Sequence, residues 1–356
     1  MMKTNVAFIG VGDISGIYLK NLSDKFNEEL HIIGLYDLDR KKAEKAAELY
    51  NVPKIYQSMT ELLADDEVDI VLNLTRPNEH YSITKAALEA GKPVYSEKPL
   101  AATTAEGRSL LELAQEKQLA VGGAPDTFLG AGIQTCQKAI QDGLIGTPVG
   151  FTASMICRGH ETWHPSPAFY YQAGGGPMMD MGPYYITALV KLLGKVQNVS
   201  AVTKSSFPER LITSEPLNGT KVAVEVPTFI TGIMEMENGV TGTLFTTFDC
   251  YEDKQASITI YGSNGTLRVP DPNKFGGPVY YLAAGSKEYV ELPLAYEYAD
   301  NSRGIGILVM AKGIKENKNF QTDISLTYHV LEVMEAFHQS GEQRTHIPIQ
   351  SEVIFA

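Results

Sequence analysis

The feature that most constrains this chain lies near its N-terminus, where the apolar run NVAFIG leads into the glycine-rich turn GVGDISG at residues 10–16. A helix-like stretch, ISGIYLKNLSDKF, overlaps the end of the turn. In such a strand–turn–helix unit the first glycine permits the tight turn, and the second lets the backbone approach a pyrophosphate bound by the helix N-terminus. The turn therefore predicts a dinucleotide site formed by Gly10, Val11, Gly12, Asp13 and Ile14.

An acid at the end of the second strand-like run supports this prediction. Asp37 ends the run ELHIIGLYD, about 20 residues beyond the turn, where a carboxylate binds the 2′-hydroxyl of the adenosine ribose. A carboxylate repels a 2′-phosphate, so Asp37 favours NAD over NADP. Arg40 and Lys41 follow closely, which leaves NADP possible. The alternative is a glycine turn in an unrelated α/β protein.

The remainder of the first 124 residues alternates short apolar runs with helical segments such as DRKKAEKAAELY. Strands that alternate with helices of about 10–15 residues indicate βαβ units and a parallel sheet. After residue 124 the pattern changes to many strand-like stretches, several of which alternate apolar and polar residues. We therefore expect an α/β fold, with a Rossmann domain at 1–124 and an α+β domain at 125–356 built on a largely antiparallel open sheet.

Composition excludes several partners. The formal net charge is −12, so the chain has no overall basic field for nucleic acid or for an acidic membrane surface. No apolar run approaches the roughly 18 residues of a membrane span. The isolated cysteines, Cys136, Cys157 and Cys250, indicate buried thiols in a reducing compartment and neither disulfides nor a zinc site. We expect a cytoplasmic protein without a metal.

Residues 75–100 read TRPNEHYSITKAALEAGKPVYSEKPL and closely resemble the Gfo/Idh/MocA family, the glucose-fructose oxidoreductase and inositol dehydrogenase group. The segments APDTFLGAG, GLIGTPVG and GGGPMMDMG continue the resemblance. It implies a Rossmann domain that holds NAD(P), and a C-terminal domain that binds substrate and forms homodimers or homotetramers through its sheet. It also implies hydride transfer to or from sugars, inositols and related polyols. The cofactor-binding residues that it implies are Thr75, Asn78, His80, Glu97 and Lys98.

Lys98 is the residue that we expect to carry the chemistry. It follows the strand-like run PVYSE, and ligands of parallel sheets bind at the carboxyl ends of the strands. To accept a proton from a substrate hydroxyl, its ammonium group needs a pKa lowered from about 10.4 toward 7–8, which partial burial and the positive nicotinamide ring favour. The alternative is that Lys98 only pairs with Glu97, although adjacent residues of a strand point to opposite faces.

The stretch GGGPMMDMGPYY, residues 174–185, is expected to supply the second half of the site. The family pattern runs from glycines to Asp-x-Gly-x-His, and Asp180 and Gly182 match it, so the resemblance implies that Asp180 completes a site with Lys98. Tyr184 stands where the family has histidine. Because tyrosine, with a pKa of about 10, is a poorer base near neutrality, either the proton transfer differs or another histidine serves. The alternative for Asp180 is the N-cap of the following helix.

The loop RGHETWHPSP, residues 158–167, offers candidate histidines. Aromatic and polar groups gathered on a loop suit sugar recognition, and we expect substrate contacts from Arg158, Trp163 and His164. We favour His164 over His160 as the acid/base group. The two prolines of the loop disfavour a helix, and with it joint metal binding by the two histidines. The alternative is a structural loop capped by the tryptophan.

The leading hypothesis is an NAD(P)-dependent oxidoreductase that transfers hydride between nicotinamide and a secondary alcohol or ketone of a sugar, inositol or related polyol. Its catalytic candidates are Lys98, Asp180, His164 and Tyr184. Asp126, just past the sixth strand-like run, is a candidate for a nicotinamide or substrate contact. Two alternatives stay open, a reductase of a keto or unsaturated substrate and a non-catalytic NAD-binding sensor. Retention of both Lys98 and Asp180 argues against the sensor. The missing histidine is the only feature that supports it.

Overall fold

A computed structural model describes residues 3–252 and 257–355 of the chain. The chain forms two compact units. Unit 1 contains the described residues up to Asp126, then Asn301–Leu331 and the described residues from Glu352 onward, and unit 2 contains Thr127–Asp300 and Glu332–Ser351. The first boundary lies close to the one expected after residue 124. The return of residues 301–331 to unit 1 was not expected from the sequence.

Unit 1 is built on a six-stranded sheet with the order β3-β2-β1-β4-β5-β6, in which all neighbouring strands run parallel. Its strands are β1 (Thr4–Ile9), β2 (Leu30–Tyr36), β3 (Lys54–Ile55), β4 (Ile70–Asn73), β5 (Val94–Ser96) and β6 (Val121–Gly123). Its helical segments are α1 (Ser15–Asp24), α2 (Arg40–Tyr50), α3 (Met59–Leu63), η1 (Pro77–Glu79), α4 (His80–Glu89), α5 (Thr104–Lys117), α8 (Ile305–Glu316) and the first residues of α9 (Ile324–Gln343).

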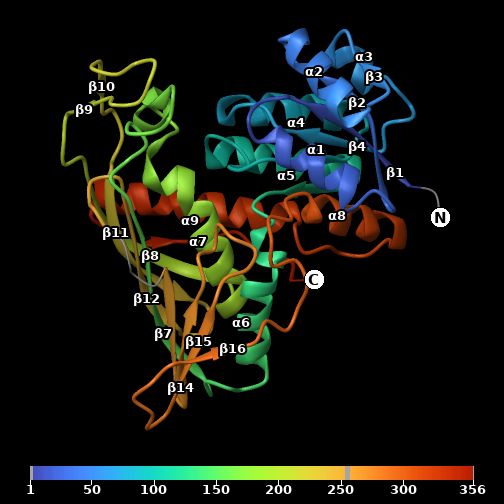
Figure 1. Ribbon diagram of the computed structural model, residues 1–356. Coiled ribbons are helices and arrows are strands. Elements are labelled where there is room, and N and C mark those ends of the chain that lie inside the picture. The colour runs from blue at the N-terminus through green and yellow to red at the C-terminus, as the bar shows by residue number, and fades with distance from the viewer. Residues whose placement is uncertain (1–2, 253–256, 356) are drawn as a thin grey trace. The chain divides into compact units, whose positions relative to one another are not determined.

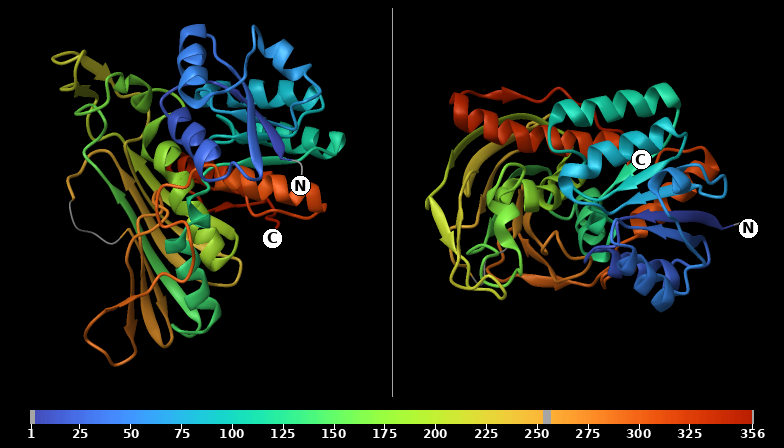
Figure 2. Two further views of the ribbon diagram at one scale, coloured as in Figure 1. Left: turned by 45° about the vertical axis from the view of Figure 1, so that its right-hand side comes forward. Right: turned by 90° about the horizontal axis from the view of Figure 1, so that it is seen from above.

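Helices cover both faces of this sheet, with α1 and α2 on one side and α4 and α5 on the other (Figures 1 and 2). The central strands are largely apolar and buried, as the buried IVLN run of β4 illustrates, because a parallel sheet between two helical layers has no solvent face. Local signals begin several helices. Thr103 and Glu106 form a capping box at the start of α5, and the Ser58 side chain caps α3.

Unit 2 contains a nine-stranded sheet with the order β16-β15-β14-β13-β7-β12-β11-β8-β17 and a separate pair, β10-β9. In the large sheet β7 and β12 run parallel and the other neighbouring strands run antiparallel. The strands are β7 (Pro148–Ile156), β8 (Val196–Lys204), β9 (Glu209–Leu211), β10 (Lys221–Ala223), β11 (Phe229–Met236), β12 (Thr241–Thr247), β13 (Ile258–Gly262), β14 (Gly265–Val269), β15 (Val279–Ala283), β16 (Val290–Leu292) and β17 (Ile347–Pro348). This is the expected α+β architecture.

The helical segments of unit 2 are η2 (Thr127–Leu129), α6 (Ala131–Gln141), η3 (Pro167–Tyr171), α7 (Gly176–Leu193) and the later part of α9. Figures 1 and 2 show α6 and α7 on one face of the large sheet. On the other face, Val202, Ile233 and Tyr261 of three strands are 63%, 47% and 42% exposed, and the strand pairing places all three side chains on that face. The sheet is therefore open on one side, as expected.

Among the described residues no helix is both long and apolar enough to cross a membrane.

Candidate active site

The glycine turn joins β1 to α1 as the sequence predicts. Gly10 has φ +95°, and a Cβ there would lie 2.8 Å from the Leu74 carbonyl, so only glycine fits. A Cβ on Gly12 would meet nothing within 4 Å, so the backbone at Gly12 is open to a ligand. The first turn of α1 holds no acid, and its N-cap, Ile14, makes no side-chain hydrogen bond. The N-terminal N–H groups of α1 can therefore bind a pyrophosphate.

Asp37 follows β2 directly and holds the glycine turn in place. One carboxylate oxygen accepts a hydrogen bond from the Val11 N–H at 2.6 Å, and the other accepts from the Asp39 N–H at 2.7 Å. A carboxylate has about four lone-pair positions, so Asp37 retains acceptor capacity for ribose hydroxyls. Asp13 and Ile14 are exposed at the same turn.

Arg40, which left NADP possible, is engaged by other side chains. It is the first residue of α2, and its guanidinium donates to Glu44 at 2.8 Å and to Gln57 at 2.5 Å. These contacts occupy two of the five guanidinium donors.

The segment after β4 is organised by a buried amide that the sequence analysis missed. Asn73 accepts hydrogen bonds from the N–H and the hydroxyl of Thr75, at 3.3 and 2.7 Å. Its amide group donates to the His80 carbonyl and to the Thr84 hydroxyl, at 3.1 Å each. Asn73 thereby fixes the loop that begins at Thr75. Asn78 is exposed in η1 and stays a candidate for a cofactor contact.

His80, a predicted cofactor contact, is buried and bonded to the backbone of its own unit. Its side chain is 1% exposed, and its two ring nitrogens lie 2.7 Å from the Pro99 carbonyl oxygen and 3.1 Å from the Thr75 carbonyl oxygen. Burial lowers the pKa of His80. The imidazole thus braces the segment after β4 against the segment after β5, and its burial does not support a direct contact with NAD.

Glu97 positions the main chain of Lys98. Glu97 is 8% exposed; its Oε1 accepts from the Tyr18 hydroxyl at 2.7 Å and its Oε2 from the Lys98 N–H at 2.9 Å. Burial, followed by the charge of Glu97, raises the pKa of Tyr18 well above its usual value, which keeps the hydroxyl a donor. Glu97 is therefore a support for Lys98, and the cofactor contact expected of it is not supported. Lys98 is partly exposed just beyond β5.

Asp126 caps a helix, a role that the sequence analysis did not consider. It is 1% exposed, and its Oδ2 accepts hydrogen bonds from the N–H groups of Gly304 and Gly306, at 2.8 and 3.1 Å, at the start of α8. Burial is the main cause that raises its pKa to about 6. This geometry does not support the expected contact of Asp126 with nicotinamide or substrate.

Asp180 lies within α7 and contacts a histidine. Because α7 begins at Gly176, Asp180 is past the first turn, which contradicts the alternative that it is the N-cap; Gly175 has that position. The Nε2 atom of His160 lies 3.1 Å from the Asp180 Oδ2, with side chains 14% and 17% exposed. The His160 Nδ1 is buried without a hydrogen-bond partner among the described residues. The neutral tautomer with hydrogen on Nε2 fits both observations, and His160 then donates to the carboxylate.

Aromatic rings surround the His160 imidazole. Its centroid lies 4.1 Å from that of Tyr170, 4.7 Å from Phe248 and 5.3 Å from Trp163. Sequence reasoning ranked His164 above His160, whereas the structure pairs His160 with the carboxylate. The His164 Nδ1 accepts from the Ser166 N–H at 3.0 Å. A substrate or acid/base contact by His164 stays a prediction.

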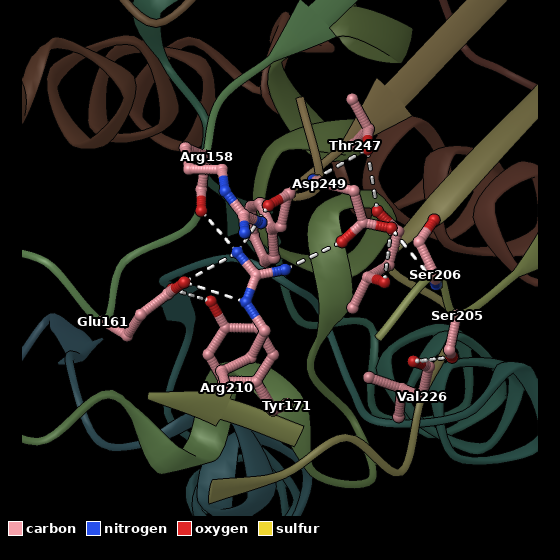
Figure 3. Close-up of polar contacts among 11 residues, drawn as sticks. Arg158, Glu161, Tyr171, Ser205, Ser206, Arg210, Val226, Thr247 and Asp249 are labelled. Atoms are coloured by element: carbon pink, nitrogen blue, oxygen red, sulfur yellow. Dashed lines mark hydrogen bonds and ion pairs between the residues drawn. The ribbon is translucent and has the colours of Figure 1, made fainter. Parts of the chain in front are cut away.

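A buried ion-pair network holds the loop that carries His160 (Figure 3). Arg210 on β9 lies 2.6 Å from the Glu161 carboxylate and 2.8 Å from that of Asp249, and all three side chains are 6% exposed or less. The Tyr171 hydroxyl donates to Glu161, and Arg210 donates to the Arg158 carbonyl. Five donors on one guanidinium allow Arg210 to join these segments at once. The sequence analysis did not identify this network.

The two other candidates of unit 2 stay predictions. The Arg158 guanidinium carbon lies 4.8 Å from the centroid of Phe207 and 5.4 Å from that of Tyr251. Tyr184 is one helical turn beyond Asp180 on α7 and is 8% exposed. Residues four apart share a face of a helix. Within the part of the chain that the structure describes, no group of three or more His, Cys, Asp or Glu side chains could hold a metal ion.

Two family models match the chain, one described as an oxidoreductase family with an NAD-binding Rossmann fold over residues 4–123, the other as the GFO/IDH/MocA C-terminal domain over residues 133–268. Together they cover more than half of the chain and correspond to a cofactor-binding and a second domain of one class of oxidoreductase. The protein belongs to the Gfo/Idh/MocA family of NAD-binding oxidoreductases. The predicted family and the NAD-binding Rossmann domain are thereby confirmed.

Curated relatives are similar over most of their length. An uncharacterised protein of Saccharomyces cerevisiae is 25% identical over 81% of this chain and 80% of its own. The trans-1,2-dihydrobenzene-1,2-diol dehydrogenase of Bos taurus is 24% identical over 86% of each chain. Among solved structures, a levoglucosan dehydrogenase in complex with NADH and L-sorbose is 19% identical, covers 99% of this chain and 100% of its own, and has a TM-score of 0.85. The last similarity concerns the fold.

Proposed function

We propose that this protein is an NAD-dependent dehydrogenase acting on a secondary alcohol, or in reverse on the ketone, of a sugar, inositol or related polyol. The observation that carries the proposal is the contact between His160 and Asp180. Asp180 has the family's acidic position, and His160 supplies an imidazole in a chain that has Tyr184 at the usual histidine position. Lys98 is retained as the basic group.

NAD fits the residues of unit 1. The space at Gly12 leaves room for the pyrophosphate beside the N-terminus of α1. The Asp37 carboxylate is held by Val11 and suits an unphosphorylated ribose. Arg40 is engaged with Glu44 and Gln57. These contacts support NAD as the preferred cofactor, and an affinity for NADP at least equal to that for NAD would contradict this part of the proposal.

The proposed reaction transfers a hydride and a proton to different groups. Bound NAD supplies a nicotinamide that takes up the hydride of the carbinol carbon. The proteinʼs own residues handle the hydroxyl proton, which passes to the Lys98 amine as the carbonyl forms. Asp180 accepts a hydrogen bond from a substrate hydroxyl and orients the ring. His160 holds the Asp180 carboxylate in position by donating from Nε2, and the aromatic rings around it exclude water.

Two further features support this reading. The bovine relative is named for a cyclic diol and the solved dehydrogenase for levoglucosan, which favours a cyclic substrate with neighbouring hydroxyls. The open face of the unit 2 sheet exposes Val202, Ile233 and Tyr261, which favours a homodimer or homotetramer through that face. A non-catalytic sensor is disfavoured because it needs neither Lys98 nor an Asp180 carboxylate oriented by histidine.

The test is a screen of sugars, inositols and other cyclic polyols for NADH formation, with the wild type beside Lys98→Ala and Asp180→Asn. We expect at least one substrate, and a fall in kcat of about 10²–10⁴-fold in both variants, with the affinity for NAD retained. Lys221→Ala, at an exposed ion pair with Glu209, is the matched control and should keep full activity. Full turnover by Lys98→Ala, or no substrate in either direction, would overturn the proposal.

A further inference from the structure

Three rings on the loop after β7 form an exposed surface that extends outward from the contact between His160 and Asp180. The Trp163 and Phe169 side chains are 61% and 46% exposed, and each lies edge-to-face with His164, at centroid distances of 5.3 and 5.4 Å. We call Trp163, His164 and Phe169 the aromatic rim. Large apolar side chains that are exposed as a group, and not singly, mark binding surfaces.

The rim is held in place by hydrogen bonds of its own loop. The Trp163 N–H donates to the His160 carbonyl at 3.2 Å. The His164 carbonyl accepts from the Ser214 hydroxyl at 2.6 Å, and the His164 ring accepts from the Ser166 N–H at 3.0 Å. Because these contacts order the loop, a ligand that binds to the rim loses little of its binding energy to ordering it.

The rim is continuous with the proposed reaction centre. The Trp163 ring is 5.3 Å from the His160 ring, and the Tyr170 ring is 4.1 Å from both His160 and Phe169. Exposure rises from 14% and 17% at His160 and Asp180 to 46% and 61% at the rim. When a substrate ring is bound at His160 and Asp180, the rim is therefore still available to a second group that is attached to that ring.

The side chains of the rim determine which chemical class of attached group can bind there. The segment WHPSPAF, residues 163–169, carries no acid, lysine or arginine, so the rim offers apolar ring faces with imidazole as its polar group. Aromatic faces with few polar groups suit a neutral ring that presents C–H groups on one side and hydroxyls at its edge. These seven residues offer no lysine or arginine to a phosphate.

On the basis of the proposed function, we propose that the aromatic rim binds a second sugar ring. The preferred substrate is then a neutral disaccharide or glycoside that is oxidised on the ring at Asp180, while its other ring stacks on the rim. A free monosaccharide reaches only Asp180 and is the poorer substrate.

Intrinsic fluorescence tests the proposal directly, because Trp163 is the only tryptophan of the chain. Its emission is titrated with maltose, cellobiose and lactose, and with glucose and galactose, using Lys98→Ala with NAD so that Asp180 is retained and turnover is slowed by about 10²-fold or more. We expect a saturable change with at least one disaccharide at about tenfold lower concentration than with its monosaccharides. Phe169→Ala should weaken that binding about tenfold, and Tyr261→Ala on the open sheet face should leave it unchanged.

Kinetics separate this proposal from the proposed function. In the wild type kcat/KM should be higher for a disaccharide, and Phe169→Ala should lose the preference while it keeps monosaccharide turnover. Equal kcat/KM for both sugar classes, or emission that changes with protein concentration and not with sugar, would overturn the second-ring site; the latter result indicates a second copy of the chain on the rim. Absence of all turnover contradicts the proposed function instead.

Discussion

The His160 imidazole lies 3.1 Å from the Asp180 carboxylate, which joins the loop after β7 to the second turn of α7. His160→Ala removes this hydrogen bond, and we expect kcat to fall on the order of 10²-fold because a displaced carboxylate no longer orients the substrate. His160→Gln keeps a donor near the Nε2 position and should restore part of the rate. Steady-state kinetics across pH measure both variants, and only a positioning role predicts a changed pH profile with rescue.

His346→Ala is the control for this prediction, because His346 belongs to the same unit and contacts Ser200 and Glu235 on the sheet. It should keep wild-type kinetics. Equal activity of His160→Ala and His346→Ala would remove His160 from the site.

Arg210 holds the loop that carries His160, and its removal should lower the stability of the protein. Arg210→Ala leaves Glu161 and Asp249, both at most 6% exposed, as buried carboxylates without their partner. We expect the free energy of unfolding to fall by about 3–5 kcal/mol. Lys221→Ala breaks an exposed pair on the neighbouring strand β10 and should cost about 0–1 kcal/mol. Urea denaturation measures the difference, and similar losses in the two variants would contradict the prediction.

Gly10 and Gly12 of the turn should separate the effect of a substitution on folding from its effect on NAD binding. Gly12→Ala places a methyl group where nothing lies within 4 Å, so the apoprotein should keep its Tm while the affinity for NAD falls at least about tenfold. Gly10→Ala meets the Leu74 backbone at φ +95° and should lower the stability of the apoprotein by about 1–3 kcal/mol. Calorimetric titration and thermal unfolding distinguish them. Normal NAD binding by Gly12→Ala would place the pyrophosphate elsewhere.

Asp126 should make stability depend on pH. Burial raises its pKa from the usual 3.8 to about 6, so the stability that its protonated form contributes is fully present below about pH 4 and is lost as pH rises through about 6. The total effect is about 3 kcal/mol. Asp126→Asn can accept from Gly304 and Gly306 without a charge, and should stabilise unit 1 above about pH 6 and little below about pH 4.

Urea unfolding of the wild type and Asp126→Asn at several pH values tests this prediction. The difference between the two proteins should grow with pH and level off above about pH 6. A constant difference would show that Asp126 does not titrate in this range.

Features encoded over short distances were predictable from the sequence. The strand–turn–helix unit at Gly10 and the alternating segments of unit 1 were correctly predicted because each depends on neighbours along the chain, and the cofactor contact of Asp37 stays a prediction. The alternative that made Asp180 the N-cap placed the start of α7 too late, although Pro177 in its first turn is a known signal. The ranking of His160 and His164 as acid/base candidates depended on which imidazole lies beside Asp180. That position follows from the packing of Tyr170 and its neighbours.

Contacts between distant segments could not be derived in this way. No local sequence pattern predicts that Arg210 is buried, because its partners Glu161 and Asp249 lie 49 and 39 residues away. Asp126 was read as a ligand contact because it follows β6, where ligands bind in parallel sheets. Its partner Gly304 lies 178 residues further on.

That last contact limits how the halves of this protein can be exchanged among relatives. The polypeptide up to Asp126 carries all six strands of the parallel sheet, yet the glycine N–H groups that donate to the Asp126 carboxylate come only after residues 127–300 of unit 2. A chimera with one crossover near residue 126 would inherit an incomplete nucleotide-binding half. A transferable unit needs further crossovers near Asn301, Leu331 and Glu352, so recombination must treat this half as an interrupted module.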